Sequence, residues 1–471
     1  MTLRYRIYLG NSKDFIESYF SSLEEDKVLA KYAATVMLAH VKALVNQGIL
    51  SKDLSKDVLA TLIDIIKTEG ETLYKWITEG NYHFEDVFEA LEAYLHEVVG
   101  INAGYIAIGR SRNDHIAAVL RLYTRDRAVE VLQKLLELRK VFLDKATEFR
   151  GIIIPYFTHG QVAQCGSASI YFASYEQTFS NIWRLLAQGF EMLNENPLGS
   201  GAASGSLLNL DRSYIAKTLC FSDGLLPPYY STGSRLFALY YLNMLSLLML
   251  EISRFAEDML LLSSLIPNSI NPPVDHVATS SIMPHKRNLV TMEIARARAS
   301  KVLGYALASQ SIYKGLPYGY NLDLQEINML LKQVFDVVTS TLNIVIDFVS
   351  RLSVNSDAFL KYVSDKPCWS SELVEYIAIT NGKPVREVYL AIAKLFKNCN
   401  SVDEKCISKV LSAFGLNAQD IWNIVKGKPI EVSIKKLLED AWTKLERDRN
   451  TLKNVIDVVE KCTAELLSYF S

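Results

Sequence analysis

The chain has 471 residues, and its 50 Lys and Arg against 52 Asp and Glu give a net charge of −2. A chain this close to neutral is not an obvious ligand of nucleic acid or of an anionic membrane, so an anionic substrate must meet a local cationic site. Its 22 Gly and 12 Pro are fewer than average usage gives. This composition predicts long elements with few turns, and it excludes collagen, a disulfide-dense scaffold and intrinsic disorder.

Helical periodicity dominates the chain. Between Ala128 and Phe149, apolar residues recur every three or four positions, which predicts one long amphipathic helix. Similar patterns predict further helices over 26–47, 54–68, 168–193, 234–265, 289–312, 324–352, 371–380, 385–397 and 434–469. No run alternates strictly enough to require a sheet, although short strands are expected near 104–108 and 150–157. Shifts in composition indicate boundaries near residues 108 and 352.

The segment 236–252 is almost uncharged, and its length is close to that of a membrane span. It carries Asn243, Ser246 and Glu251, and we identify no second segment of this kind to pair with it. A helix that is apolar on all sides also suits the centre of a large helical bundle. We therefore interpret 236–252 as a buried core helix, and we expect neither a membrane nor nucleic acid as a partner.

The six cysteines form no CxxC pair, and their spacing does not resemble that of a zinc site. The first residues are too polar to begin a signal peptide, and no apolar segment of the required kind follows them. We therefore expect reduced thiols in a cytoplasmic protein that holds no metal. Pairing of Cys399 with Cys406 is the alternative that a loop between them would allow.

Two loops in the first half of the chain carry residues that packing does not require. The loop 109–115 (GRSRNDH) offers two guanidinium groups and an amide just before a helix, which suits recognition of a carboxylate. An ordinary helix cap by Asn113 or Asp114 would explain the same residues. The loop 156–161 places His159 among polar neighbours. A single His is more often structural than catalytic, but its pKa suits proton transfer at neutral pH.

Two further loops lie in the second half. The loop 279–288 (TSSIMPHKRN) combines hydroxyls, cations and an amide before a helix, so it can present N–H groups and charge to an oxyanion. A solvated basic loop with a Ser cap is the alternative. The segment 318–326 is rich in hydrogen-bonding side chains and follows a helix break. The sequence contains no glycine-rich phosphate loop, so no nucleotide cofactor is expected.

The pattern SSxMPxKxN at 280–288 resembles the signature loop of the fumarase/aspartase superfamily. The remaining motifs resemble one family of that superfamily, the argininosuccinate lyases, in order and in spacing. They are GRSRND at 109–114, TH-Q at 158–161, PLGSGA at 197–202, LNLDR at 208–212, SRFAED at 253–258 and KGLP--YN-DLQE at 314–326. The resemblance extends from about residue 15 to 326 and continues more weakly through 371–397. Adenylosuccinate lyase and fumarase share the signature loop but lack the SRND and KGLP contexts.

This resemblance implies a mainly α, three-domain chain with a long-helix bundle at its centre. The domains would be a helical N-terminal domain at 1–108, the bundle with the signature loop at 109–352 and a helical C-terminal domain at 353–471. Four chains would join their bundles into a twenty-helix core, with each active site shared between subunits. The implied reaction is the reversible elimination of N-(L-arginino)succinate to L-arginine and fumarate in arginine biosynthesis, without metal or organic cofactor.

The resemblance also implies the residues of the site. The catalytic group would be His159, Ser280, Lys286 and Glu293, with Glu293 orienting and polarising the histidine. We favour Ser280 as the base and His159 on the acid side, but the family is described both ways, so the assignment stays open. The residues that would bind substrate are Ser22, Ser111, Arg112, Asn113, Thr158, Arg235, Asn288, Tyr320 and Gln325.

Several positions depart from the family pattern, among them the following four. Phe88 stands in place of a histidine, Cys165 in place of a proline and Thr279 in place of a glycine, and Asn328 replaces a lysine expected near a substrate carboxylate. Two alternatives therefore stay open: a lyase that releases fumarate from another N-substituted succinate, and a non-catalytic structural paralogue like the lens delta-crystallins. All residues assigned to proton transfer are kept, which favours a working lyase.

Overall fold

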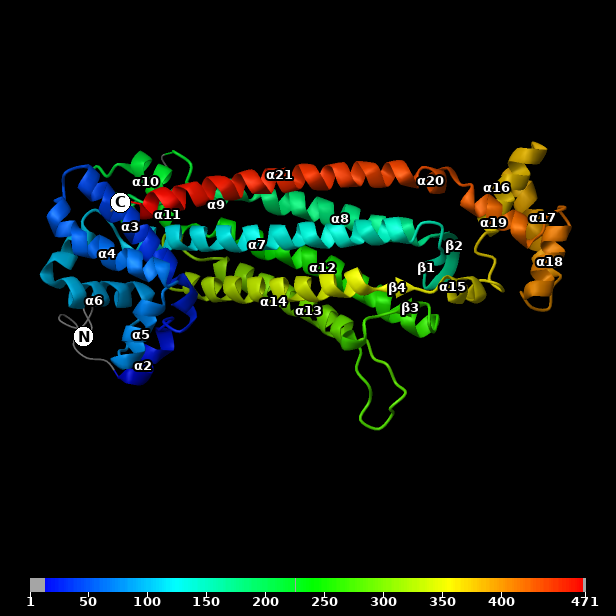
Figure 1. Cartoon of the computed structure of the whole chain (residues 1–471), viewed down its shortest axis with the longest axis horizontal. Coiled ribbons are helices and arrows are strands. Elements are labelled where there is room, and N and C mark those ends of the chain that lie inside the picture. The colour runs from blue at the N-terminus through cyan, green and yellow to red at the C-terminus, as the bar shows by residue number, and fades with distance from the viewer. Residues whose placement is uncertain (1–12, 225, 469–471) are drawn as a thin grey trace.

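The computed structural model of the chain describes residues 13–224 and 226–468 and shows an elongated, mainly helical molecule (Figure 1). Short helices gather at one end of it: α2 (Asp14–Phe20), η1 (Glu25–Leu29), α3 (Ala30–Asn46), α4 (Lys52–Lys67), α5 (Glu71–Glu79), α6 (Val87–Val99) and η2 (Gly100–Ala107). Most of α3 is buried, because it packs against η1, α4, α6 and the central bundle. The strand expected near 104–108 is wrong. This segment forms η2, which packs on α6 and buries Ala103 and Ile106.

Long helices lie side by side along the molecule and form the central bundle (Figure 1). They are α7 (Arg112–Glu148), α8 (Ala168–Gln188), α12 (Leu236–Leu265), α13 (Val290–Tyr313), α14 (Leu324–Arg351) and α21 (Ile434–Leu467). The apolar stripe predicted between Ala128 and Phe149 is buried, because α7 contacts α8, α14 and α21. Short helices connect the bundle: α9 (Phe190–Leu193), α10 (Arg212–Leu219) and α11 (Pro228–Gly233).

The other end of the molecule holds the strands and the C-terminal helices. The antiparallel hairpin of β1 (Ile153–Thr158) and β2 (Gln161–Ser167) agrees with the strand expected near 150–157. The other elements there are β3 (Ile270–Asn271), η3 (Val274–His276), β4 (Ser353–Val354), α15 (Ser356–Tyr362), α16 (Ser370–Asn381), α17 (Val385–Lys397), α18 (Glu404–Ser412), α19 (Ala418–Lys426) and α20 (Pro429–Val432). α16–α19 form a second, smaller apolar core with the base of the hairpin. The domain boundaries at 108 and 352 stay a prediction.

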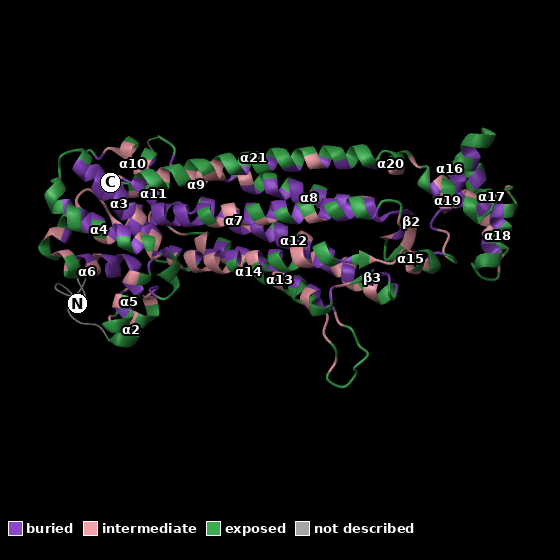
Figure 2. Cartoon of the chain, viewed as in Figure 1, coloured by how far each residue is buried: buried purple, intermediate pink, exposed green. Residues whose placement is uncertain are grey.

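Among the described residues, three helices are long and apolar enough to cross a membrane by length and composition alone, so the expectation of a single such segment is wrong. They are Glu25–Asn46, Leu236–Leu265 and Leu324–Arg351. Within the chain, 83% of the apolar window of the first is buried, against 56% and 39% for the other two. The segment predicted as a core helix, α12, packs against α8, α13 and α14. One face of it nevertheless leaves leucines exposed, and Figure 2 shows exposed residues along the bundle.

All six cysteines pair, so the expectation of reduced thiols is wrong. The disulfides are Cys165–Cys368, Cys220–Cys462 and Cys399–Cys406. The first two join residues that are 203 and 242 positions apart in the sequence, with Cα atoms 5.2 and 6.0 Å apart in the fold. Spacing along the chain could not reveal these pairs, because the fold alone brings them together. The Cys399–Cys406 pair is the one disulfide that the sequence analysis considered, as an alternative to reduced thiols.

We expect the two long-range disulfides to stabilise the chain more than the short one. Each closes a loop of more than 200 residues, for which loop entropy gives about 5 kcal/mol, against about 2 kcal/mol for the short loop of Cys399–Cys406. Cys220→Ser/Cys462→Ser should therefore lower the urea midpoint more than Cys399→Ser/Cys406→Ser, as followed by circular dichroism. A wild-type midpoint that dithiothreitol leaves unchanged would contradict this expectation.

Candidate active site

The residues predicted to form the site lie in three separate parts of the chain. One group surrounds the start of α7, a second is the turn of the β1–β2 hairpin, and a third is the long loop between η3 and α13. In Figure 1 this loop projects away from the bundle, while the hairpin lies at the end of the bundle opposite to the start of α7.

The start of α7 is built as a capping box. The Ser111 hydroxyl accepts a hydrogen bond from the Asn113 backbone N–H at 3.3 Å, and the Asp114 carboxylate accepts one from the Ser111 N–H at 3.0 Å. Asp114 also accepts the Gly201 N–H at 2.9 Å, and the Asn113 side chain donates to the carbonyl of Ala202 at 3.1 Å. The motifs 109–114 and 197–202 therefore meet here, although some 90 residues separate them.

Arg112 lies beside two carboxylates. It forms ion pairs with Glu85 and Asp86. Burial would lower the pKa of Arg112, but the carboxylates of Asp86 and Glu85 outweigh it and raise the pKa. Burial raises the pKa of Tyr320, and the charges of Arg112 and Arg235 oppose that rise. The three predicted substrate residues Arg112, Arg235 and Tyr320 are therefore electrostatic neighbours.

Ser22, Gln325 and Asn328 line one small cavity beside this group. The Ser22 hydroxyl donates to Asp26 at 2.8 Å, and burial raises the pKa of Asp26 to about 7. The Gln325 amide donates to the carbonyl of Phe20 at 3.5 Å. Asn328 therefore lies next to two of the predicted substrate residues. Phe88, by contrast, is buried in the core and does not line the cavity.

Arg235 is the most unusual residue of the group, because it is a fully buried cation that forms no ion pair with any residue that the structure describes. Its Nη1 donates to the carbonyls of Thr232 and Ser234, both at 3.1 Å. Its Nε and Nη2 have no hydrogen-bond partner in the described part of the chain. Burial lowers the pKa of Arg235 to about 10, and its guanidinium lies 6.0 Å from the centre of the Tyr320 ring. A buried guanidinium with free donors is suited to receive a carboxylate.

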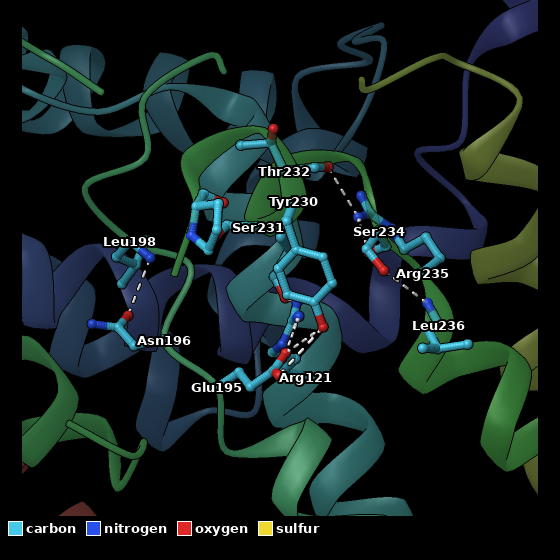
Figure 3. A network of polar contacts seen from close by, with 12 residues as sticks. Arg121, Glu195, Asn196, Leu198, Tyr230, Ser231, Thr232, Ser234, Arg235 and Leu236 are labelled. Atoms are coloured by element: carbon cyan, nitrogen blue, oxygen red, sulfur yellow. Dashed lines mark hydrogen bonds and ion pairs between the residues drawn. The ribbon is translucent and has the colours of Figure 1, made fainter. Parts of the chain in front are cut away.

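A network of polar contacts holds the backbone that supports Arg235 (Figure 3). Glu195 accepts from Arg121 on α7 at 3.1 Å and from the hydroxyl of Tyr230 on α11 at 3.0 Å. α11 is thereby tied to the bundle just before Arg235. The sequence analysis missed this network. The signal for it was Arg121, a charge inside an otherwise apolar stretch of α7.

The hairpin presents His159 at its tip. Thr158 pairs with Gln161, which leaves His159 and Gly160 as a two-residue turn, and both have positive φ angles of 54° and 71°. Such a turn matches the twist of the two strands, and His adopts this conformation more readily than most residues. Thr158 and His159 are exposed. No side-chain hydrogen bond or ion pair of His159 is found within 13–224 and 226–468.

Contacts with the C-terminal helices hold the base of the hairpin. Cys165 is bonded to Cys368, and its N–H donates to the Cys368 carbonyl at 3.1 Å. Lys428 donates to the Cys165 carbonyl and to Glu372, both at 2.8 Å. The residue that replaces the family's proline therefore joins the hairpin to the C-terminal helices.

The signature loop is mostly exposed between its two ends. Its ends meet in an antiparallel bridge, in which the N–H groups of Ala278 and Asn288 donate to each other's carbonyls at 3.0 and 2.9 Å. Ser280 and Lys286 lie within the loop, and Glu293 is exposed in the first turn of α13. Thr279, the departure from glycine, is exposed.

Rigid helices keep the group at the start of α7 apart from the other two groups within one chain. α7 has 37 residues, so its start and the hairpin that follows its end are separated by about 55 Å. α13 has 24 residues and separates the signature loop at its start from the Tyr320 segment beyond its end by about 36 Å. A substrate of ordinary size held at Arg235 cannot reach His159 or Ser280 of the same chain.

We predict that Arg235 binds a carboxylate and not only its own backbone. In Arg235→Met the buried charge is removed, so the thermal midpoint of the free protein should change little, while the rise caused by succinate or fumarate disappears. In the wild type, ligand at a concentration of 100 Kd should raise the free energy of unfolding by about 2.7 kcal/mol. Arg125→Met is the matched control, since Arg125 is also buried and donates to the carbonyls of Leu219 and Cys220. It should lower the midpoint and keep the response to ligand. An undiminished response in Arg235→Met would contradict this role.

Solved structures share this fold. An EDDS lyase in complex with formate superposes with a TM-score of 0.78 at 21% sequence identity, over 96% of this chain and 93% of that one. A class II fumarase from Schistosoma mansoni gives 0.65 at 17% identity, over 83% and 91%. The prediction of a mainly α fold of the fumarase/aspartase type is confirmed.

Curated proteins with similar sequences indicate to which family of lyases the chain belongs. Residues 8–304 match the family model described as Lyase. An argininosuccinate lyase from Pyrococcus furiosus is 35% identical over 95% of this chain and 96% of its own length. Argininosuccinate lyases from Sulfurisphaera tokodaii and Sulfolobus acidocaldarius are 36% and 37% identical, over 84% and 82% of this chain and 84% and 83% of theirs. With these relatives, and with the motifs that the fold brings together at the start of α7, this chain belongs to the argininosuccinate lyase family.

Proposed function

We propose that the chain is a carbon–nitrogen lyase that converts N-(L-arginino)succinate reversibly to L-arginine and fumarate in arginine biosynthesis. The observation that carries this proposal is the 35% identity with an argininosuccinate lyase over 95% of the chain. The geometry supports it, because the buried Arg235 offers unused donors beside the predicted substrate residues.

The reaction makes three chemical demands. A base removes a weakly acidic proton from the carbon next to a carboxylate, and the dianion that results needs cations and N–H donors in place beforehand. An acid protonates the departing guanidino nitrogen. Ser280 and Lys286 share one exposed loop, so a hydroxyl and a cation reach a ligand together. His159 at its hairpin tip supplies the second proton-transfer group.

The start of α7 suits the dicarboxylate end of the substrate. Arg235 brings a buried positive charge without an anion, which a substrate carboxylate would neutralise in a site with little water. Arg112 is already paired with Glu85 and Asp86, so it orients the substrate more than it attracts it. This division leaves Arg235 as the principal anion receptor of the group.

A complete site requires several copies of the chain. Groups that rigid helices hold about 36 and 55 Å apart can meet only if neighbouring chains supply them. Exposed apolar side chains on the bundle offer the surface for that assembly: Leu236, Leu247, Leu250, Leu261 and Leu265 on α12, Ile294, Leu303 and Leu307 on α13, and Ile344 on α14. We infer a homotetramer of about 212 kDa, four times the 53.1 kDa of one chain.

We also propose a cytoplasmic location, with a small-molecule substrate and neither nucleic acid nor a membrane as partner. Three disulfides usually indicate an oxidising compartment. Intracellular proteins of hyperthermophilic archaea are an exception, because many are rich in disulfides. Relatives of this chain come from archaea such as Pyrococcus furiosus, so the disulfides are compatible with a cytoplasm.

A lyase acting on another N-substituted succinate is the second candidate, and one observation favours it. Asn328 lines the same cavity as Ser22 and Gln325. The lysine that the family pattern has at this position is therefore missing next to predicted substrate residues. A charge-assisted hydrogen bond at this point would contribute about 1.5–3 kcal/mol to binding. Phe88 no longer supports the second candidate, since it is part of the core.

The test is the release of fumarate, followed by its ultraviolet absorbance, with argininosuccinate, adenylosuccinate and aspartate as substrates. We expect activity with argininosuccinate and a loss of several orders of magnitude in Ser280→Ala, because this hydroxyl is needed only in the transition state. Ser281→Ala, the neighbouring hydroxyl, should keep most of the activity. If Ser280→Ala retained more than about a tenth of the rate, a loss under 1.4 kcal/mol, its catalytic role would be wrong. Faster turnover of adenylosuccinate or aspartate would favour the second candidate.

A further inference from the structure

A buried histidine anchors the loop that carries Ser280 and Lys286. His276 ends η3 directly before the loop, and Thr291 lies in the first turn of α13 directly after it. The Nδ1 atom of His276 lies 2.8 Å from Thr291 Oγ1, and its Nε2 atom lies 2.8 Å from Asp347 Oδ2 on α14. One imidazole ring therefore connects both ends of the loop to a long helix of the bundle.

The partners decide the direction of these hydrogen bonds. The hydrogen bond from Arg351, and then the one from His276, lower the pKa of Asp347, so its carboxylate is an acceptor. Nε2–H of His276 then donates to Asp347, and the Thr291 hydroxyl is the hydrogen-bond partner of Nδ1. Both ring nitrogens are used, and the ring is only 3% exposed. Neither rotation nor displacement of the ring is possible without breaking both bonds.

Further contacts stabilise the base of the loop around His276. Arg351 forms ion pairs with both Asp347 and Asp275, the latter at 2.9 Å. The ring of His276 packs edge-on against Phe348 with 5.4 Å between the ring centres. We call Asp275, His276, Thr291, Asp347 and Arg351 the loop-base cluster. Beyond the bridge of Ala278 and Asn288 the loop is mostly exposed, so its direction is set where it leaves this cluster.

We propose that His276 is a positioning residue, and that the loop-base cluster sets the place at which the loop presents Ser280 and Lys286 to substrate. The proposal rests on the proposed function of the loop. Substrate held by Arg235 of another chain approaches a loop with little internal support, so a small change at the base is carried to the reacting atoms. If a change at a residue outside the chemistry displaces the reacting groups by about 1 Å, the rate can fall about a hundredfold.

The variants distinguish the effect of the hydrogen bonds of His276 from the effect of side-chain shape. Thr291→Val removes the hydroxyl at nearly constant shape, and His276→Phe removes both hydrogen bonds while it keeps a ring against Phe348. Thr291→Ser retains the hydroxyl and is the conservative rescue. Thr341→Val is the matched control, because the Thr341 hydroxyl is buried on α14 and donates only within its own helix, to Val337 at 2.7 Å.

Two measurements are made on the full-length assembled protein. Hydrogen–deuterium exchange of peptides that cover 277–289 reports the mobility of the loop without any need for activity. Steady-state kinetics with argininosuccinate report kcat and KM. In Thr291→Val and His276→Phe we expect faster exchange of the loop and a fall in kcat of about tenfold or more. KM should stay within about twofold, because most of the predicted substrate-binding residues lie outside this loop. Thr291→Ser and Thr341→Val should behave as the wild type in both measurements.

Two results would overturn the proposal: loop exchange in Thr291→Val and His276→Phe that equals the wild type, or faster exchange with an unchanged kcat. A fall in kcat of the same size in Thr341→Val would also overturn it, because the effect would then be one of general stability. Failure of the proposed function is recognised separately, since a wild-type protein that releases no fumarate leaves the exchange measurement intact.

Discussion

The length and stiffness of α7 set the main constraint on this molecule. Its 37 helical residues place the capping box at one end and the hairpin with His159 about 55 Å away at the other. Buried packing against α8, α14 and α21 prevents the helix from bending to close that distance. Any chemistry that needs both ends must therefore combine different copies of the chain.

The polar groups left without partners point to the same conclusion. Arg235 is buried with two of its nitrogen atoms unpaired in the described chain, an arrangement that costs stability unless an anion arrives. His159 has a positive φ angle at the tip of the hairpin, and no side-chain hydrogen bond or ion pair explains it among residues 13–224 and 226–468. The unpaired nitrogen atoms of Arg235 and the conformation of His159 would both be explained by a site that substrate and neighbouring chains complete. The energy cost is met elsewhere by the large apolar core of the bundle.

Much of the bundle could be predicted from the sequence, because its helices are long and keep one apolar stripe over many turns. α13, α14 and α17 begin and end within a residue of the predicted ranges. The short helices α18 and α19 were not predicted, since nine residues give too few turns for a periodic signal. The segment expected as a strand near 104–108 became η2 through packing on α6, which local sequence does not encode.

The candidate residues of the site could be chosen from the sequence, but their arrangement could not. Short motifs predict roles for Arg112, His159 and Ser280, because reacting groups need particular residue types at fixed spacing, and these roles stay a prediction. The two long-range disulfides join residues that only the fold brings together. The same is true of the bonds of His276 to Thr291 and Asp347, which lie 15 and 71 positions away in the sequence. Glu195 and Tyr230 were missed for the same reason.

The claim that one chain cannot hold a complete site is tested most directly by mixing two inactive proteins. Chains with His159→Asn and chains with Ser280→Ala are unfolded, mixed in equal amounts and refolded together, and fumarate release is measured. If different chains supply the two residues, about a quarter of the sites receive both intact residues and activity returns to that level. The control mixes His159→Asn with the double variant His159→Asn/Ser280→Ala, in which no site can have an intact histidine. A mixture that assembles to the wild-type mass and stays as inactive as its components would show that both residues act within one chain.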